Sequence, residues 1–156
     1  MKRLLTAAIA LFISQAVLAG VKIEHWVTPS GARVQFVESR VLPMLDVQVD
    51  FAAGSMFDPE GKSGLAALTR GALDLGAGKF DEIAIAEQMA DIGASLAGGA
   101  DTDRANVSLR TLSAKDKREP ALNILKAVLH APLFDAAIFE REKARTIAGL
   151  KEAMTR

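Results

Sequence analysis

The apolar positions of this chain follow two different periods, and together they predict a mixed fold. Residues 45–51 alternate, so that one face of an extended segment is apolar and the other carries Asp46, Gln48 and Asp50. Residues 21–27 and 32–38 also alternate, and the Pro-Ser-Gly sequence between them predicts a hairpin. A further strand is expected over residues 105–112, after the glycine-rich segment that begins at Gly93.

Helical spacing of apolar residues predicts helices over 65–75 and 81–92, and a closing pair over 121–130 and 135–154. The mixed charges of 115–119 precede a proline and predict a solvated turn. The resulting order is β-β-β-α-α-β-β-α-α. This order predicts an α+β fold, with helices packed on one face of a largely antiparallel sheet.

The first 19 residues have the pattern of a secretory signal peptide. Lys2 and Arg3 form a basic start, residues 4–13 are apolar, and Val-Leu-Ala at 17–19 makes a small-residue cleavage site. The apolar run is shorter than the roughly 20 residues that span a bilayer. We therefore expect a mature chain from Gly20, consisting of one domain over 20–156, in the periplasm or secreted, without a stable membrane span.

Charge and cysteine content narrow the classes of partner. Lys and Arg together number 19, as do Asp and Glu, so the formal net charge is zero and becomes −2 when Lys2 and Arg3 are removed. Such a chain has no basic stripe to neutralise phosphates, which argues against a nucleic-acid partner. It has no cysteine, so the fold does not rely on disulfides. An export signal on a cysteine-free chain favours a bacterial periplasm.

Residues 52–71 connect the alternating strand at 45–51 to the first helix, and they carry the most specific motif. Asp58-Pro59-Glu60-Gly61 is a strong turn signal, and Ser63 is placed to cap the helix that follows. The segment resembles the active-site loop of the pitrilysin/insulysin (insulinase-type) zinc peptidases, the inverzincins, which reads A-G-S-x-x-D-x-x-G-x-x-G-L-A and leads into H-x-x-E-H. The matching residues here are Ala53-Gly54-Ser55, Asp58, Gly61 and Gly64-Leu65-Ala66.

The resemblance extends over about residues 20–156, and it implies the N-terminal domain of a longer subunit, incomplete at residue 156. Within the metal-binding pentad, however, Ala67, Arg70 and Gly71 stand where the family has His, Glu and His. Two imidazoles one helical turn apart are needed to hold zinc, with the Glu as general base. Alanine and glycine offer no ligand, and a permanent guanidinium charge repels a cation. We expect no catalytic residue, no metal site and no cofactor in this chain; zinc is expected only in an active partner subunit.

The family's third zinc ligand lies in an E-R-E-[RK] segment, which resembles residues 140–143. Glu142, or with less support Glu140, is the vestigial ligand that this resemblance implies. Without two histidines a lone carboxylate holds zinc poorly, so a solvated helix face is the expected role. His25 and His130 have no partner at ligand spacing, and His130, near a helix end, is expected to be structural.

In active relatives an edge strand with the pattern G-x-x-x-N-A-x-T-S-x-D pairs with the substrate backbone. Here Gly93 and Asp103 match, whereas the other four positions differ, holding Ala97, Gly98, Ala100 and Asp101. Edge pairing uses backbone groups and does not require those side chains, although two consecutive glycines weaken a strand. The residues alone therefore assign no substrate-binding position.

The function that the resemblance implies is a non-catalytic subunit of a periplasmic peptidase, paired with an active H-x-x-E-H homologue to form the peptide-cleaving chamber. A stand-alone peptide-binding or scaffold protein is the alternative. An active metallopeptidase with ligands beyond residue 156 ranks last, because the family's metal helix belongs to this domain.

Overall fold

A computed structural model describes residues 21–155, and the chain divides between Leu42 and Pro43 into two compact units. The signal peptide expected over 1–19 lies outside the described residues. The first unit contains an antiparallel hairpin of β1 (Ile23–Val27) and β2 (Arg33–Val37), whose turn includes Gly31 at φ +88°. The sequence pattern predicted this hairpin to within a residue or two at each end.

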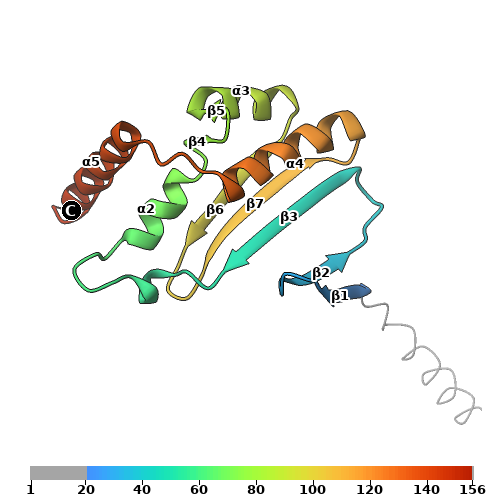
Figure 1. The fold of residues 1–156 in the computed structure, drawn as a ribbon, viewed down its shortest axis with the longest axis horizontal. Helices are drawn as coiled ribbons and strands as arrows, with labels where there is room; N and C mark the ends of the chain where they lie inside the picture. The colour runs from blue at the N-terminus through green and yellow to red at the C-terminus, as the bar shows by residue number, and fades with distance from the viewer. Residues whose placement is uncertain (1–20, 156) are drawn as a thin grey trace, which may run out of the picture. The chain divides into compact units, whose positions relative to one another are not determined.

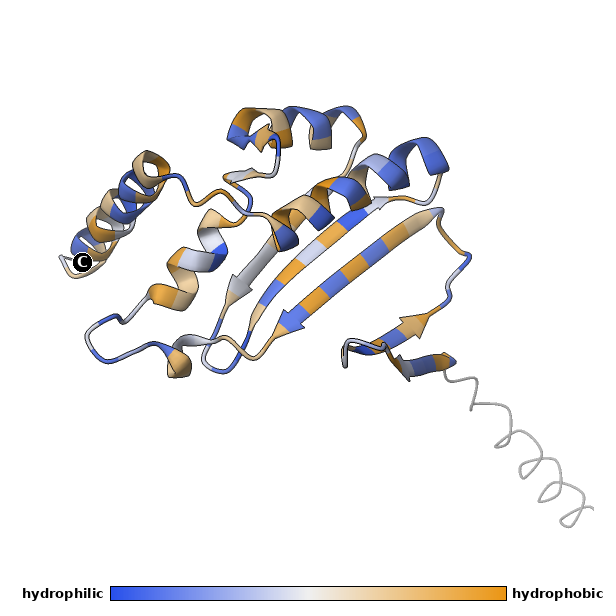
Figure 2. Cartoon of the chain, in the orientation of Figure 1, coloured by the Kyte–Doolittle hydropathy of each residue, from blue (hydrophilic) through white to orange (hydrophobic). Residues whose placement is uncertain are grey.

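The sheet of the second unit has three antiparallel strands in the order β3 (Met44–Phe51), β7 (Ala105–Leu112) and β6 (Ser95–Ala100) (Figure 1). Its register places the apolar residues of β3 opposite those of β7, as in the pairs Val47↔Leu109 and Val49↔Val107. Figure 2 shows the alternation of apolar and polar residues along β3. The pattern of residues 45–51 thus predicted the strand and the face on which Leu45, Val47 and Val49 are half-buried.

The polar face of the sheet carries an ion pair between neighbouring strands. Arg110 Nε lies 2.6 Å from Asp46 Oδ1, and Arg110 Nη2 lies 3.2 Å from Oδ2. This bidentate hydrogen bond holds the pKa of Asp46 below its usual range. Both side chains are mostly exposed, so the pair orients the strands more than it stabilises them.

Three helices pack on the apolar face: α2 (Leu65–Ala72), α3 (Glu82–Asp91) and α4 (Lys115–His130) (Figure 1). The fold is therefore the expected α+β type. A last helix, α5 (Ala136–Ala153), contacts α2 and has no buried residue. The buried apolar core is made of Ala77, Ile85, Met89, Val107, Leu109, Ala121, Ile124, Leu125 and Val128.

Two features of this unit differ from the sequence prediction. A short hairpin of β4 (Gly76–Ala77) and β5 (Phe80–Asp81) joins α2 to α3, where only a connection between the helices predicted over 65–75 and 81–92 was expected. The solvated turn predicted over 115–119 is wrong, because these residues form the start of α4, with Pro120 inside the helix. Proline removes one backbone donor there. Burial of Ala121, Ile124 and the apolar residues that follow outweighs that loss.

Thr111 is expected to limit stability. It is 1% exposed, and among the described residues its hydroxyl is the buried side-chain oxygen that lacks a hydrogen-bond partner. Thr111→Val removes this unpaired group and should raise the free energy of unfolding by about 1 kcal/mol in urea denaturation. The matched control is Val107→Thr on the same strand and face, which buries a new hydroxyl and should lower stability by about 1–3 kcal/mol. A Thr111→Val protein less stable than the wild type would contradict this account.

Candidate functional site

The loop between β3 and α2 is held against the turn between β6 and β7. It contains a short 3-10 helix, Ser55–Phe57, whose first two backbone N–H groups donate to Asp101 O at 2.8 Å and Thr102 O at 2.9 Å. Gly54 lies so close to this turn that a Cβ atom would overlap the backbone of residues 102–104. The Ala-Gly-Ser motif therefore has a packing role that is independent of metal.

Asp58 caps the first helix of the site. Its Oδ2 accepts a hydrogen bond from the Gly64 N–H at 2.8 Å, and its Oδ1 accepts one from the Ala66 N–H at 2.9 Å. The expectation that Ser63 caps this helix is wrong, because the N-cap residue is Gly64 at φ +94° and it has no side-chain cap. The turn after Asp58 brings its carboxylate back to the helix N-terminus, where the unpaired N–H groups and the helix dipole favour a negative charge.

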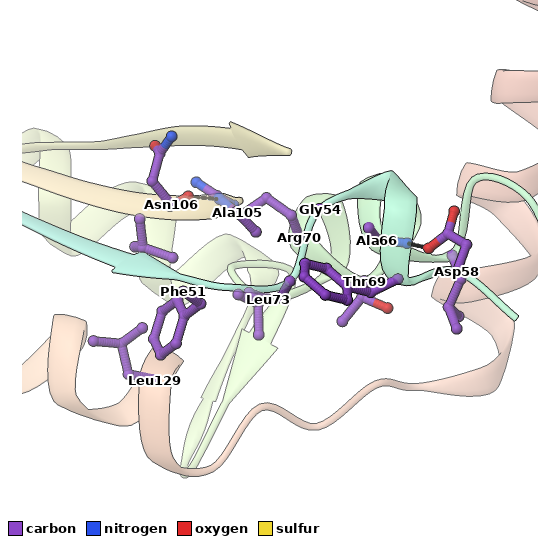
Figure 3. A pocket seen from close by; sticks show the side chains of 14 residues that line it. Phe51, Gly54, Asp58, Ala66, Thr69, Arg70, Leu73, Ala105, Asn106 and Leu129 are labelled. Carbon is purple, nitrogen blue, oxygen red and sulfur yellow. Dashed lines mark hydrogen bonds between the residues drawn. The ribbon is translucent and has the colours of Figure 1, made fainter. Parts of the chain in front are cut away.

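The three degenerate positions lie on α2 with unequal environments. Ala67 and Gly71 are exposed, whereas Arg70 is only 6% exposed. The Arg70 Nε donates a 2.7 Å hydrogen bond to the backbone oxygen of Asn106 on β7, and its Nη1 lies 3.7 Å from Asp74 Oδ1. Figure 3 shows the Arg70 side chain reaching from α2 to Asn106. The residue at the base position thus links the helix to the sheet.

Gly98 on β6 makes room for this arginine. It has φ +142°, and a Cβ atom there would lie 2.7 Å from both Nε and Nη2 of Arg70 and would also overlap Asn106 O. The sequence indicated only that glycine weakens a strand; the structure shows a formed strand with a glycine at the one position that the guanidinium approaches. A side chain added at position 98 would therefore overlap the Arg70 guanidinium. No signal in a single sequence connects positions 70 and 98.

The described residues contain no group of three or more His, Cys, Asp or Glu side chains that could hold a metal ion. Glu142 lies on α5, where its carboxylate accepts from Arg141 Nε at 2.7 Å and Arg145 Nη1 at 3.1 Å. The hydrogen bond from Arg141 and the charge of Arg145 hold the pKa of Glu142 below its usual range. Glu140 pairs instead with Lys143. Both candidate ligands are thus engaged with cations on their own helix.

The remaining candidates are spread over the chain. Ala97, Gly98 and Ala100 lie on β6, which α2 contacts, while Asp101 lies in the following turn and accepts from the backbone of Asp103 and Arg104. The two histidines belong to different elements: His25 is on β1 in the first unit, and His130 is the last residue of α4. Of the positions singled out in the sequence, the structure therefore brings together those on α2 and those on β6.

A cavity of about 390 Å³ lies beside Arg70. Most of its lining is apolar, and Thr69, Arg70 and Asp58 supply polar side chains (Figure 3). Its large apolar members come from β3, the loop, α2, β7 and the end of α4, and they are Phe51, Phe57, Leu65, Leu73, Val107 and Leu129. Nothing in the sequence motif predicted this cavity, because its walls are separated by up to 78 positions along the chain.

The fold and the site together define an α+β domain that keeps the loop and helix of a metallopeptidase without its ligands or base. The sequence model for insulinase (peptidase family M16) matches residues 34–155, and the chain belongs to this family as a non-catalytic member. A crystal structure described as the peptidase M16 inactive domain from Pseudomonas fluorescens is similar, with 42% sequence identity and a TM-score of 0.81.

The match to the Pseudomonas structure covers 85% of this chain but only 32% of the other one, so the chain spans about a third of that relative. A comparison with curated proteins finds no match. Within residues 21–155, none of the helices is long and apolar enough to cross a membrane.

Proposed function

We propose that this chain is part of a non-catalytic subunit of an exported insulinase-type zinc peptidase, and that it acts by pairing with an active H-x-x-E-H homologue to enclose peptide substrates. The observation that carries the proposal is Arg70. A buried guanidinium hydrogen-bonded to the sheet stands where the family has its general base, yet the Asp58 cap and the Gly54 packing are intact. A domain that keeps this frame without the chemistry is suited to a structural role in an assembly.

The proposal requires that zinc belong to the partner. Since Ala67 and Gly71 provide no ligand and Arg70 repels a cation, the purified chain should contain no stoichiometric zinc and hydrolyse no peptide above background. Elemental analysis and a fluorogenic peptide assay test both expectations. About one zinc per chain that is lost on Glu142→Ala would restore the enzyme hypothesis.

Association is tested with the full-length subunit and an active H-x-x-E-H homologue. The two should co-elute in size-exclusion chromatography, with an interface well over 1,000 Å², and the complex should hydrolyse peptides faster than the homologue alone. If the two neither form a complex nor change the rate of hydrolysis, the alternative of a stand-alone peptide-binding or scaffold protein is favoured instead.

The expected cleavage after Ala19 is checked by N-terminal sequencing of the exported product.

A further inference from the structure

The cavity beside Arg70 has the features of a site for a small ligand. Its volume of about 390 Å³ falls within the roughly 300–1,000 Å³ of small-molecule sites, and such sites combine apolar walls with a few polar groups. The walls are supplied by two phenylalanines and several aliphatic side chains, among them Phe51, Phe57 and Leu73. An apolar body of a few carbon atoms would remove these side chains from water.

Arg70 is the cationic side chain that lines this cavity. A guanidinium has five N–H donors, and this one is buried while its Nε donates to Asn106 O. Its Nη2 has no hydrogen-bond partner among residues 21–155, and Nη1 is 3.7 Å from Asp74, beyond hydrogen-bonding distance. An arginine that lines an apolar cavity and keeps unused donors favours a carboxylate, which accepts two parallel N–H groups.

The nearby carboxylates do not satisfy this demand. Asp58 lines the same cavity, but both its oxygens accept backbone N–H groups at the start of α2. Asp74 is partly exposed and holds only the long contact with Nη1. A ligand carboxylate would therefore meet one incompletely paired cation, whereas the charge of Asp58 is directed at the helix N-terminus.

We propose that this cavity binds ligands in which a carboxylate is joined to an apolar body, with the Arg70 guanidinium as the partner of the carboxylate. Two sources supply this chemistry: a medium-chain fatty acid, and the C-terminus of a peptide that ends in an apolar residue. The proposal goes beyond the pairing function and does not depend on it, because every residue involved belongs to this chain.

The test is isothermal titration of the full chain with two acids and their neutral analogues: octanoate against octanamide, and N-acetyl-leucyl-leucine against its C-terminal amide. At least one acid should bind saturably, and on the order of tenfold more tightly than its amide, as expected for a charge-assisted hydrogen bond. The acid that binds identifies the source. Equal binding of acid and amide, or no saturable binding of either acid, would overturn the proposal.

Variants assign the effect to the cavity. Arg70→Met keeps an apolar stem and should reduce acid binding to the level of the amide, while Arg110→Met, on the opposite face of the sheet, should leave it unchanged. Ala53→Leu adds bulk to the cavity wall and keeps the guanidinium, so it should weaken acid and amide together. It also serves if Arg70→Met fails to fold by circular dichroism. Acid binding that survives Ala53→Leu undiminished, or that Arg110→Met weakens equally, would contradict the assignment.

Discussion

Gly98→Ala is expected to lower the free energy of unfolding by about 3–5 kcal/mol, enough to unfold much of the domain at ambient temperature. Two costs combine. At φ +142° an L side chain is strained, and its Cβ would overlap both Asn106 O and the Arg70 guanidinium. Neither neighbour moves easily, since one is sheet backbone and the other is a buried charge. Chemical denaturation followed by circular dichroism measures the change.

Gly99→Ala is the matched control for this prediction. Gly99 is the next residue on β6, and a Cβ there would meet nothing within 4 Å. Its substitution should change stability by less than about 1 kcal/mol. Adding Arg70→Ala to Gly98→Ala should cost less than the sum of the two single changes, because one of the two overlaps disappears while the backbone strain remains. Equal stabilities for the Gly98 and Gly99 variants would show that the close approach of Arg70 has no energetic weight.

Arg70→Glu is expected to cost about 3–5 kcal/mol, although it restores the residue type that the family has at this position. The introduced carboxylate would be buried, would face the Asn106 carbonyl oxygen without a donor, and would lie near Asp74. Arg70→Met is the control: it leaves Asn106 O without this donor and should cost about 1–3 kcal/mol. Both are measured by urea denaturation.

The pH dependence separates a charge effect from a packing effect. Burial and like charge raise the folded-state pKa of an introduced carboxyl above its unfolded value, so the folded state binds the extra proton. The penalty of Arg70→Glu should therefore be largest above that raised pKa and should shrink as the pH falls through it. The stability of Arg70→Met relative to the wild type should stay nearly constant over the same range. A pH-independent loss in Arg70→Glu would mean that shape alone is responsible.

Much of the architecture could be predicted because it depends on short-range patterns. The alternation of residues 45–51 predicted β3 and its half-buried apolar face, and the spacing of Leu65, Leu68 and Ala72 predicted α2. Asp81 caps the start of α3 with its side chain, and Gly93 at φ +65° follows the end of the helix. Both residue types are typical of these positions. The absence of the zinc ligands and the base at positions 67, 70 and 71 could also be read from the sequence. These positions lie within one pentad, so no tertiary structure is needed to compare them with the family motif.

The start of α4 could not be predicted in this way. Proline and mixed charges favour a turn when only neighbouring residues are considered, but Ala121, Ile124 and Val128 are buried against β7 and impose a helix. Ser63 was preferred as a cap for the same reason, that it adjoins the helix in sequence. The actual cap, Asp58, reaches the helix only because the intervening turn reverses the chain.

The sequence by itself determined that this protein has an α+β insulinase-type frame and that its metal pentad lacks ligands and base, because both properties depend on residues close together in the chain. Only the tertiary structure decided what stands in place of the chemistry. Arg70 bonds to a backbone oxygen 36 positions away, and Gly98 provides the space. The adjoining cavity exists only where five segments meet. Such contacts depend on which surfaces the folded chain brings together, so the periodicity of apolar residues along the chain cannot predict them.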